Sequence, residues 1–231
     1  IFLENVKNLV SHDNGDTFKI IIKQLTNIGY NVRYSILSSS KHGNIPQNRE
    51  RIFIVGFLDR EQAEIFRFPK KIKLNKNIKD FFEREVNNNF YYTNKSKIFE
   101  ILNENIKNKN IYQYRRYYVR ENKSGLCPTL TANMGSGGHN VPIIRDDTGI
   151  RKLTPRECLL FQGFPSDYKI SISNCHIYKQ AGNSVTISVV RRIARNIFFA
   201  MRYKRIKGDI GTFILSPVVG FDNDRPIIFE E

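Results

Sequence analysis

The chain has 231 residues, 40% of them hydrophobic, and a formal net charge of +15 at pH 7. It contains no run of about 18 apolar residues, which argues against a membrane span, and its three cysteines form no Cys-x-x-Cys pair, which argues against a disulfide framework and a zinc site. The length predicts one large or two small domains with a substantial core, and the cysteine usage predicts a reducing cytoplasm.

Residues 1–6, IFLENV, predict a short buried strand that ends at a polar pair. The start of the chain has neither a basic segment nor a cleavage site, so we expect no signal peptide. Because the sequence opens in the middle of an apolar strand, we expect it to be cut from something larger.

Residues 11–30 predict an amphipathic helix. The apolar side chains that recur with helical spacing are Phe18, Ile21, Ile22 and Leu25. Asn14 or Asp16 would cap the start of the helix, and Gly29 would end it. Strands are predicted at residues 31–39 and 51–57, so the order strand, helix, strand, strand indicates an α/β fold.

Two arginines, Arg49 and Arg51, stand two residues apart at the entrance to the last of these strands. Alternation along a strand would place both guanidinium groups on one face. Such a pair commonly makes solvated salt bridges, and Glu50 is available. A guanidinium fork also binds phosphates and base edges bidentately, so the pair alone leaves both interpretations open.

The positive charge is concentrated in the middle of the chain. Residues 69–152 have a net charge of +9, against +2 for residues 1–68 and +4 for residues 153–231. This segment is rich in Lys and Asn and predicts helix only in patches. A concentrated basic region predicts a polyanionic partner, for which nucleic acid is the usual choice.

Basic and aromatic side chains interleave in YQYRRYYVR, residues 112–120, and a loop with one proline and several glycines follows at residues 125–140. The interleaved side chains are Arg115, Arg116 and Arg120, with Tyr112, Tyr114, Tyr117 and Tyr118. They could grip phosphate groups, or be partly core and partly solvated.

The segment TPRECLLFQGFP, residues 154–165, predicts the start of a helix. Thr154 would be the N-cap, Pro155 the first helical residue, and Glu157 the partner that completes a capping box.

Residues 182–205 predict a long helix, capped by Asn183 or Ser184. Its apolar side would carry Val189, Ile193, Ile197 and Met201. From Gly208 onward the sequence shows no pattern that predicts structure.

Several short motifs follow one another in a recognisable order: FLENV, PQNRERIFIVGF, a basic insert, RECLLFQGFP and QAGNSV. In this order they resemble the C-terminal half of a DNA (cytosine-5) methyltransferase of the bacterial restriction–modification type. The resemblance extends from residue 1 to about residue 203. Each motif is weak by itself, and the ordered set with its basic insert is specific.

The resemblance implies an α/β fold: the C-terminal part of a Rossmann-like, S-adenosylmethionine-dependent methyltransferase domain with an inserted, mostly irregular target recognition domain. Residues 1–68 would belong to the catalytic domain, residues 69–152 to the recognition domain, and residues 153–207 to the C-terminal helices of the catalytic domain. Residues 208–231 form a tail of unknown role. The RECLLFQGFP segment would be a structural helix that braces the recognition domain.

The resemblance also implies catalytic roles. In the family a cysteine thiolate adds to C6 of cytosine, and negative charge builds on the ring through N3 and O2. Glu4 matches the acid at N3, and such proton donation is typically worth about 10²–10⁴ in rate. Arg51 would face O2 as an oxyanion-type donor, Arg49 would hold Glu4 and a backbone phosphate, and Gln47 would be structural. The alternative for Glu4 is a strand-end carboxylate that caps the next turn.

The target cytosine must be flipped out of its duplex. Thr129 and Leu130 match the family's Thr-Leu pair, in which the threonine supports the phosphate beside the flipped base. Gly137 and Gly138 would let the backbone approach DNA closely, and the neighbouring His139 would read base edges or simply face solvent.

Further DNA contacts are expected from Arg115 and Arg116, which would bind phosphates, and from Asn140, which would read base edges. On the cofactor side, Asn183, Ser184 and Val185 match the Gly-Asn-Ser-Val helix start. The resemblance places them at the methionine end of S-adenosylmethionine, with a plain N-cap as the alternative. No metal is implied.

The chain also departs from the family. The Gly-rich cofactor loop and the Pro-Cys-Gln nucleophile do not occur in residues 1–231, and Cys127-Pro128 has the reverse order. We expect Cys127 to be structural or close to DNA. The chain is therefore expected to be inactive alone. Its expected partners are duplex DNA and an N-terminal methyltransferase half, either as a separate subunit or as the missing part of the same chain.

Two rival interpretations remain. A non-catalytic DNA-binding specificity subunit or fragment would need none of Glu4, Arg51 and Asn183, whose presence argues against it. A tRNA cytosine-5 methyltransferase ranks low, because the Cys-Phe-Thr signature of that branch is absent.

Overall fold

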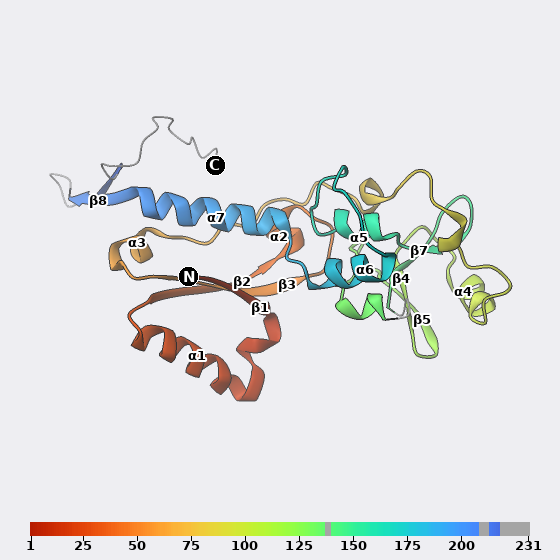
Figure 1. Ribbon diagram of the computed structural model, residues 1–231, viewed down its shortest axis with the longest axis horizontal. Coiled ribbons are helices and arrows are strands. Elements are labelled where there is room, and N and C mark those ends of the chain that lie inside the picture. The colour runs from red at the N-terminus through yellow and green to blue at the C-terminus, as the bar shows by residue number, and fades with distance from the viewer. Residues whose placement is uncertain (137–139, 208–212, 218–231) are drawn as a thin grey trace. The chain divides into compact units, whose positions relative to one another are not determined.

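The computed structural model describes residues 1–136, 140–207 and 213–217, and the chain divides into two compact units (Figure 1). The first unit contains Ile1–Ser35, Ile52–Pro69 and the described residues from Ile193 onward. The second unit contains Ile36–Arg51 and Lys70–Arg192. Each unit therefore combines segments that lie far apart in the sequence.

The first unit is built on a three-stranded sheet in the order β1-β3-β2. The strands are β1 (Phe2–Val6), β2 (Asn31–Ser38) and β3 (Glu50–Phe57), so all three predicted strands are confirmed. β3 is the central strand, and from Ile52 to Val55 no side chain is more than 3% exposed. A continuous apolar run of this kind suits a strand that is covered on both faces.

The prediction that the first strand is buried is wrong. β1 is an edge strand of the sheet, and Phe2, Leu3 and Val6 are 37%, 43% and 50% exposed. An edge strand has a neighbour on one side only, and the described part of the first unit leaves these side chains open to solvent.

The first long helix, α1 (Asp16–Asn27), packs its predicted apolar stripe against Ile52 and Ile54 of β3. Its N-cap is Gly15, with φ of +89°, so the predicted caps Asn14 and Asp16 are wrong. Glycine adopts this left-handed conformation without strain. Gly29 follows the end of the helix with φ of +98°, which confirms the predicted stop.

Helix α3 (Arg60–Ile65) begins at Asp59, whose carboxylate accepts hydrogen bonds from the amides of Glu61 and Gln62. Figure 1 shows α1 on one side of the sheet and α3 on the other, together with the part of α7 (Ile187–Arg202) that belongs to this unit. Strands β8 (Tyr203–Lys207) and β9 (Phe213–Pro217) form an antiparallel pair after α7.

The second unit contains a four-stranded antiparallel sheet in the order β5-β4-β6-β7. Its strands are β4 (Tyr112–Arg115), β5 (Tyr118–Glu121), β6 (Ile143–Arg145) and β7 (Ile150–Lys152). Most of residues 69–152 lie outside strands and helices, as expected for a mostly irregular region, but the segment also contains this sheet, which was not predicted. The segment YQYRRYYVR lies in a β-hairpin, because a two-residue turn at Arg116 and Tyr117 lets the flanking residues pair.

The remaining short elements connect these strands and helices. They are α2 (Ser39–Gly43), α4 (Phe99–Asn105) and 3₁₀ turns at Lys7–Val10, His12–Gly15, Ile78–Phe81, Asn88–Phe90 and Ala132–Gly135. In the described residues no helix is long and apolar enough to cross a membrane.

Helix α5 (Pro155–Leu160) starts as predicted. The Thr154 hydroxyl accepts from the Glu157 amide at 3.1 Å, and the Glu157 carboxylate accepts from the Thr154 amide at 2.8 Å. Both halves of the capping box are therefore confirmed.

The predicted last helix is wrong at its start. Asn183 is the last residue of α6 (Asn174–Asn183), Ser184 is the C-cap of that helix, and α7 begins only at Ile187. Ser184 is in an extended conformation, with φ of −72° and ψ of 162°. The QAGNSV motif therefore spans the break between two helices.

The predicted boundary at Pro69 coincides with the start of the long segment of the second unit, Lys70–Arg192. The predicted return to the catalytic domain at residue 153 has no counterpart in this division, because α5 and α6 pack within the second unit. The interpretation of residues 69–152 as a recognition domain stays a prediction.

Candidate functional site

The side chain of Arg49 joins two parts of the second unit that are distant in sequence. Its Nη1 donates to the carbonyl oxygen of Leu130 at 2.9 Å, and its Nη2 donates to those of Gly182 and Ser184 at 3.1 and 2.5 Å. The residue is only 3% exposed. The expected role in holding a phosphate therefore does not fit this placement, since both Nη atoms bind carbonyl groups inside the protein.

Gly182 brings the same two segments into backbone contact. A Cβ atom at this position would lie 2.1 Å from the carbonyl carbon of Thr131 and 2.3 Å from the amide nitrogen of Ala132. No side chain fits in such a gap, so glycine is required for α6 to lie against the loop. The loop expected at the DNA and the segment expected at the cofactor thus touch without an intervening side chain.

The two residues of the Thr-Leu pair have different surroundings. The Leu130 side chain is 1% exposed and belongs to the main apolar cluster of the second unit, so its predicted role as a DNA contact is wrong for the side chain. Thr129 is half-buried, and its hydroxyl donates to the carbonyl of Asn48. A phosphate at Thr129 would compete with that carbonyl for the single hydroxyl proton.

Gln47 is confirmed as structural. It is fully buried, and its Nε2 donates to the carbonyl of Phe161 at 2.6 Å. Its neighbour in space, Cys127, is also fully buried, and the two residues form an isolated β-bridge. Burial raises the pKa of the Cys127 thiol well above its usual range. A thiol held in its protonated form is a poor nucleophile, so the burial of Cys127 fits the structural alternative.

The three residues expected at the cofactor lie at the break between α6 and α7. The Asn183 side chain is exposed and Val185 is partly exposed. The Ser184 hydroxyl donates to the Ala181 carbonyl at 2.9 Å, and the Ser184 amide donates to the Gln180 carbonyl at 2.8 Å. Asn183 and Val185 are therefore able to contact a ligand, whereas Ser184 uses its polar groups to shape the break.

The expected catalytic pair, Glu4 and Arg51, is divided between the two units. Glu4 is half-buried on β1 in the first unit. Arg51 is half-buried at the start of β3 in the second unit, and its Nη1 donates to the Glu50 carbonyl at 2.8 Å. Their convergence on one base stays a prediction.

Arg115 and Arg116 lie at the turn of the β4–β5 hairpin, which projects from the body of the second unit (Figure 1). Both side chains are exposed, and Arg115 Nη2 donates to Gln113 Oε1 at 3.0 Å. Gly137, Gly138 and His139 lie outside the described residues. The exposed guanidinium groups fit a phosphate contact, which stays a prediction.

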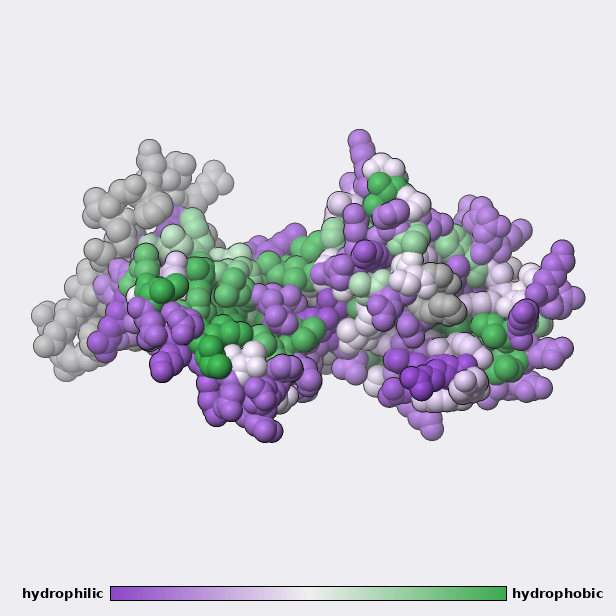
Figure 2. Space-filling model, turned by 60° about the horizontal axis from the view of Figure 1, so that its bottom comes forward, coloured by the Kyte–Doolittle hydropathy of each residue, from purple (hydrophilic) through white to green (hydrophobic). Residues whose placement is uncertain are grey.

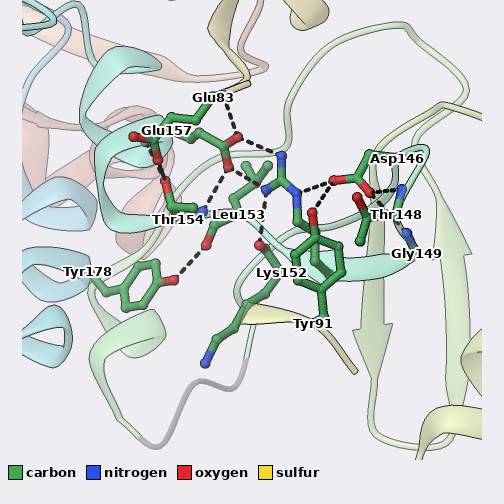
Figure 3. Close-up of polar contacts among 11 residues, drawn as sticks. Glu83, Tyr91, Asp146, Thr148, Gly149, Lys152, Leu153, Thr154, Glu157 and Tyr178 are labelled. Carbon is green, nitrogen blue, oxygen red and sulfur yellow. Dashed lines mark hydrogen bonds and ion pairs between the residues drawn. The ribbon is translucent and has the colours of Figure 1, made fainter. Parts of the chain in front are cut away.

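Sequence reasoning missed the buried charge network around Arg151, shown in Figure 3. Arg151 binds Glu157 of α5 on one side and Asp146 on the other, and the Tyr91 hydroxyl donates to the same Asp146 carboxylate at 2.9 Å. Burial would raise the pKa of Asp146, but the hydrogen bond from Arg151 and backbone amides lower it below its ordinary value. Through Glu157, which also accepts from the Glu83 amide, α5 braces this region as expected.

Comparison with known proteins is consistent with the motif order. The family model for C-5 cytosine-specific DNA methylase matches residues 1–199. The type II methyltransferase M.Bsp6I of Bacillus sp. (strain RFL6) is 54% identical over 206 residues, covering 87% of this chain and 65% of that protein. M.DsaV of Dactylococcopsis salina is 36% identical, with 85% and 56% covered, and M.SsoII of Shigella sonnei is 38% identical, with 84% and 52% covered.

Solved structures share the fold at low sequence identity. The methyltransferase EhMeth of Entamoeba histolytica superposes with a TM-score of 0.63 at 18% identity, covering 86% of this chain and 62% of that one. The Dnmt2 methyltransferase of S. pombe gives 0.61 at 19%, with 86% and 66% covered. The α/β architecture is thus that of methyltransferases.

The chain spans only 65%, 56% and 52% of the lengths of the three bacterial relatives named above. The family match covers residues 1–199 and therefore includes segments of both structural units. The chain belongs to the C-5 cytosine-specific DNA methylase family, among the type II methyltransferases of bacterial restriction–modification systems.

Proposed function

We propose that this chain is the recognition and C-terminal catalytic part of a DNA cytosine-5 methyltransferase. The complete enzyme would transfer a methyl group from S-adenosylmethionine to C5 of a cytosine flipped out of a specific duplex site. The observation that carries the proposal is the Arg49 guanidinium, which bonds Leu130 on one side and Gly182 and Ser184 on the other. One side chain therefore fixes the spacing between the loop at Leu130, which we place at the DNA, and the segment 182–184, which we place at the cofactor. Two reacting substrates require such a fixed spacing.

On the DNA side, Glu4 is the proposed acid at cytosine N3 and Arg51 the proposed donor at O2. A carboxyl group that donates a proton near neutral pH needs a site that excludes water. The guanidinium of Arg51 stays charged throughout the physiological range, so it can stabilise negative charge on O2 without losing a proton. Arg49 is a positioning residue in this scheme, and Thr129 would support the backbone beside the flipped base.

On the cofactor side, the residues fit S-adenosylmethionine in part. The exposed amide of Asn183 offers both donors and an acceptor for the amino and carboxylate groups of the methionine end, and Val185 offers an apolar surface. Ser184 fits less well, because its hydroxyl donates to Ala181. The cofactor supplies the activated methyl group, and these residues would hold its methionine end in place.

A further protein segment is proposed to complete the site. β1 lies at the edge of the first unit's sheet with Phe2, Leu3 and Val6 exposed. Figure 2 shows hydrophobic surface on this part of the molecule, in its left half. An edge strand with apolar side chains is a template for further pairing. We propose the N-terminal methyltransferase half as the partner, which would bring the nucleophile and the Gly-rich loop.

Complementation tests this function. The chain would be mixed with the N-terminal part of M.Bsp6I, the 54% identical relative, and transfer of labelled methyl groups to duplex DNA would be followed. The matching C-terminal part of M.Bsp6I is the positive control. We expect methylation only when both parts are present, with 5-methylcytosine as the product.

The alternative function is a DNA-binding specificity module without catalysis. Because the Pro-Cys-Gln motif does not occur in residues 1–231, this alternative is favoured over methylation by the chain alone. Duplex binding without any methylation in the mixture, while the positive control is active, would support that alternative. Methylation by the chain alone would contradict the assignment of the nucleophile to a partner.

A further inference from the structure

The second unit contains a hollow that the proposed catalytic chemistry does not use. Its volume is about 800 Å³, and the side chains that line it include Tyr92, Tyr114, Tyr118, Arg115, Arg116 and Lys152. A volume of this order is typical of sites for small organic ligands.

The floor of the hollow is apolar and well supported. Tyr92, Tyr114 and Ile98 pack against the apolar cluster formed by Ile143 and its neighbours, in which Leu102 is fully buried. The Tyr92 amide also donates to the Ile150 carbonyl at 2.8 Å, which ties this residue to β7. The aromatic rings at the floor are therefore held by packing and do not need a ligand to order them.

The rim carries positive charge. Arg115 and Arg116 come from the hairpin turn, where Arg116 has φ of +49°, and Lys152 comes from the end of β7. No Asp or Glu is among the described residues that line the hollow. Cations over a low-dielectric floor focus a positive potential, which favours an anionic ligand.

Aromatic rings beneath a cationic rim suit one chemical class in particular. A nucleobase stacks on tyrosine rings whatever its identity, and arginine binds the attached phosphate bidentately. Asn140 adds an amide at the edge, suited to a base edge. A base inside a duplex cannot use this surface, because both of its faces are already stacked on neighbouring pairs.

We propose that this hollow binds one unpaired nucleotide, with its base against Tyr92 and Tyr114 at the floor and its phosphate at Arg115 and Arg116. The inference rests on the proposed function, in which the second unit meets DNA. The nucleotide is distinct from the target cytosine, which the proposed function assigns to Glu4 and Arg51. Its source is either a base displaced from a DNA strand or a free nucleotide.

Fluorescence binding to the full chain tests the proposal. The probes are a short duplex with one unpaired 2-aminopurine, the same duplex fully paired, and deoxyadenosine monophosphate. We expect the unpaired probe to bind about fivefold or more tightly than the paired duplex, because stacking of one base on an aromatic side chain is worth at least that factor.

Neighbouring residues provide matched controls. Tyr114→Ala should remove the preference for the unpaired base, whereas Tyr117→Ala should keep it, since Tyr117 is 87% exposed and does not line the hollow. In the same way, Arg116→Gln should weaken binding of the unpaired probe more than Arg120→Gln, which changes an exposed arginine outside the hollow. Thermal unfolding would verify that each variant is folded.

The outcomes separate this inference from the proposed function. Equal affinity for paired and unpaired duplexes, with duplex binding that weakens as salt rises, would overturn the inference and leave the proposed function standing. No binding of either duplex would overturn both. A preference that depends on Tyr114 supports the inference, and competition by the free nucleotide at the same site would identify the free nucleotide as a source.

Discussion

Arg151 and Glu157 form a bidentate ion pair in the interior of the second unit. Nη1 donates to Oε2 and Nη2 to Oε1, both at 2.8 Å, and the two side chains are 1% and 0% exposed. The pair joins β7, at the edge of the four-stranded sheet, to the capped helix α5. A buried pair of this kind is costly to break, because the remaining charge has no water to solvate it.

Glu157→Gln should therefore destabilise the protein strongly. The change removes one of the two carboxylates that neutralise Arg151, while Asp146 remains, and we expect a loss of up to about 3–5 kcal/mol in the free energy of unfolding, measured by denaturant titration. Asp147→Asn is the control, because it breaks the Lys109 pair, whose side chains are 60% and 92% exposed. The control should leave stability almost unchanged. Equal losses in both variants would contradict a special role for the buried pair.

Arg49→Lys should loosen the link between the loop at Leu130 and the segment 182–184. Lysine keeps the charge but lacks the planar fork that reaches the carbonyls of Leu130 and Ser184. Each buried carbonyl left without a donor costs about 1–3 kcal/mol, so the unfolding midpoint should fall measurably. Arg60→Lys, at a side chain that is 84% exposed, should not change it. A stable Arg49→Lys variant would show that other contacts hold the two segments together.

Gly182→Ala should separate α6 from the loop. The added methyl group would lie 2.1 Å from the Thr131 carbonyl carbon, so the backbone must move, and overpacking of this kind typically costs about 1–3 kcal/mol or more. Gly149→Ala is the control, since its nearest neighbour would be at an ordinary 3.6 Å. Hydrogen exchange should report faster opening at Thr131 and Ala132 in the first variant only. Unchanged exchange would mean that the loop adapts without cost.

Local signals predicted much of this fold. The stripe of α1 and the capping box of α5 depend on residues within a few positions of one another, and the structure confirms both. The edge position of β1 could not be read locally, because exposure depends on which strand lies next to it. The same limit explains why the predicted burial of Phe2 and Leu3 failed.

In the candidate site, too, nearby residues in the sequence predict some features, and other features depend on contacts between distant residues. Asn183 and Ser184 have the composition of an N-cap, yet the helix break is held by Arg49, 135 residues from Ser184 in the sequence. Arg151 also carried no local signal, since its partners become apparent only when β7 meets α5. Motif order identified the family, whereas the roles of Arg49 and Gly182 followed only from tertiary contacts.

Stability should fall on mild acidification because of His42. This residue is 7% exposed, and its Nδ1 accepts from the Ser38 amide at 3.0 Å. Burial lowers the pKa of His42, and nearby Arg192, Lys71 and Lys41 lower it further, although the contact with the Ser38 backbone opposes the shift. The unfolded chain therefore binds the proton more readily than the folded chain does.

The stability of the fold that depends on a neutral His42 is fully present above the unfolded pKa of about 6.5. It is lost progressively as the pH falls below that value. The unfolding midpoint should therefore decline between about pH 7 and pH 5, and His42→Asn should flatten that part of the profile. His12→Asn serves as the control, because His12 is exposed and its Nδ1 lies 2.9 Å from the Thr17 hydroxyl oxygen. A profile that stays equally steep in His42→Asn would exclude this residue as the cause.

The most direct test of the proposed catalytic part is single-turnover methylation by the chain combined with an N-terminal methyltransferase half. Glu4→Gln keeps the shape of the side chain but removes the transferable proton. It should lower the methylation rate by about 10²-fold or more, with DNA affinity little changed. Glu104→Gln, the same change at an exposed position on α4, should methylate at the wild-type rate. If Glu4→Gln also methylates at the wild-type rate, then Glu4 is only a strand-end carboxylate and the catalytic assignment of this chain is wrong.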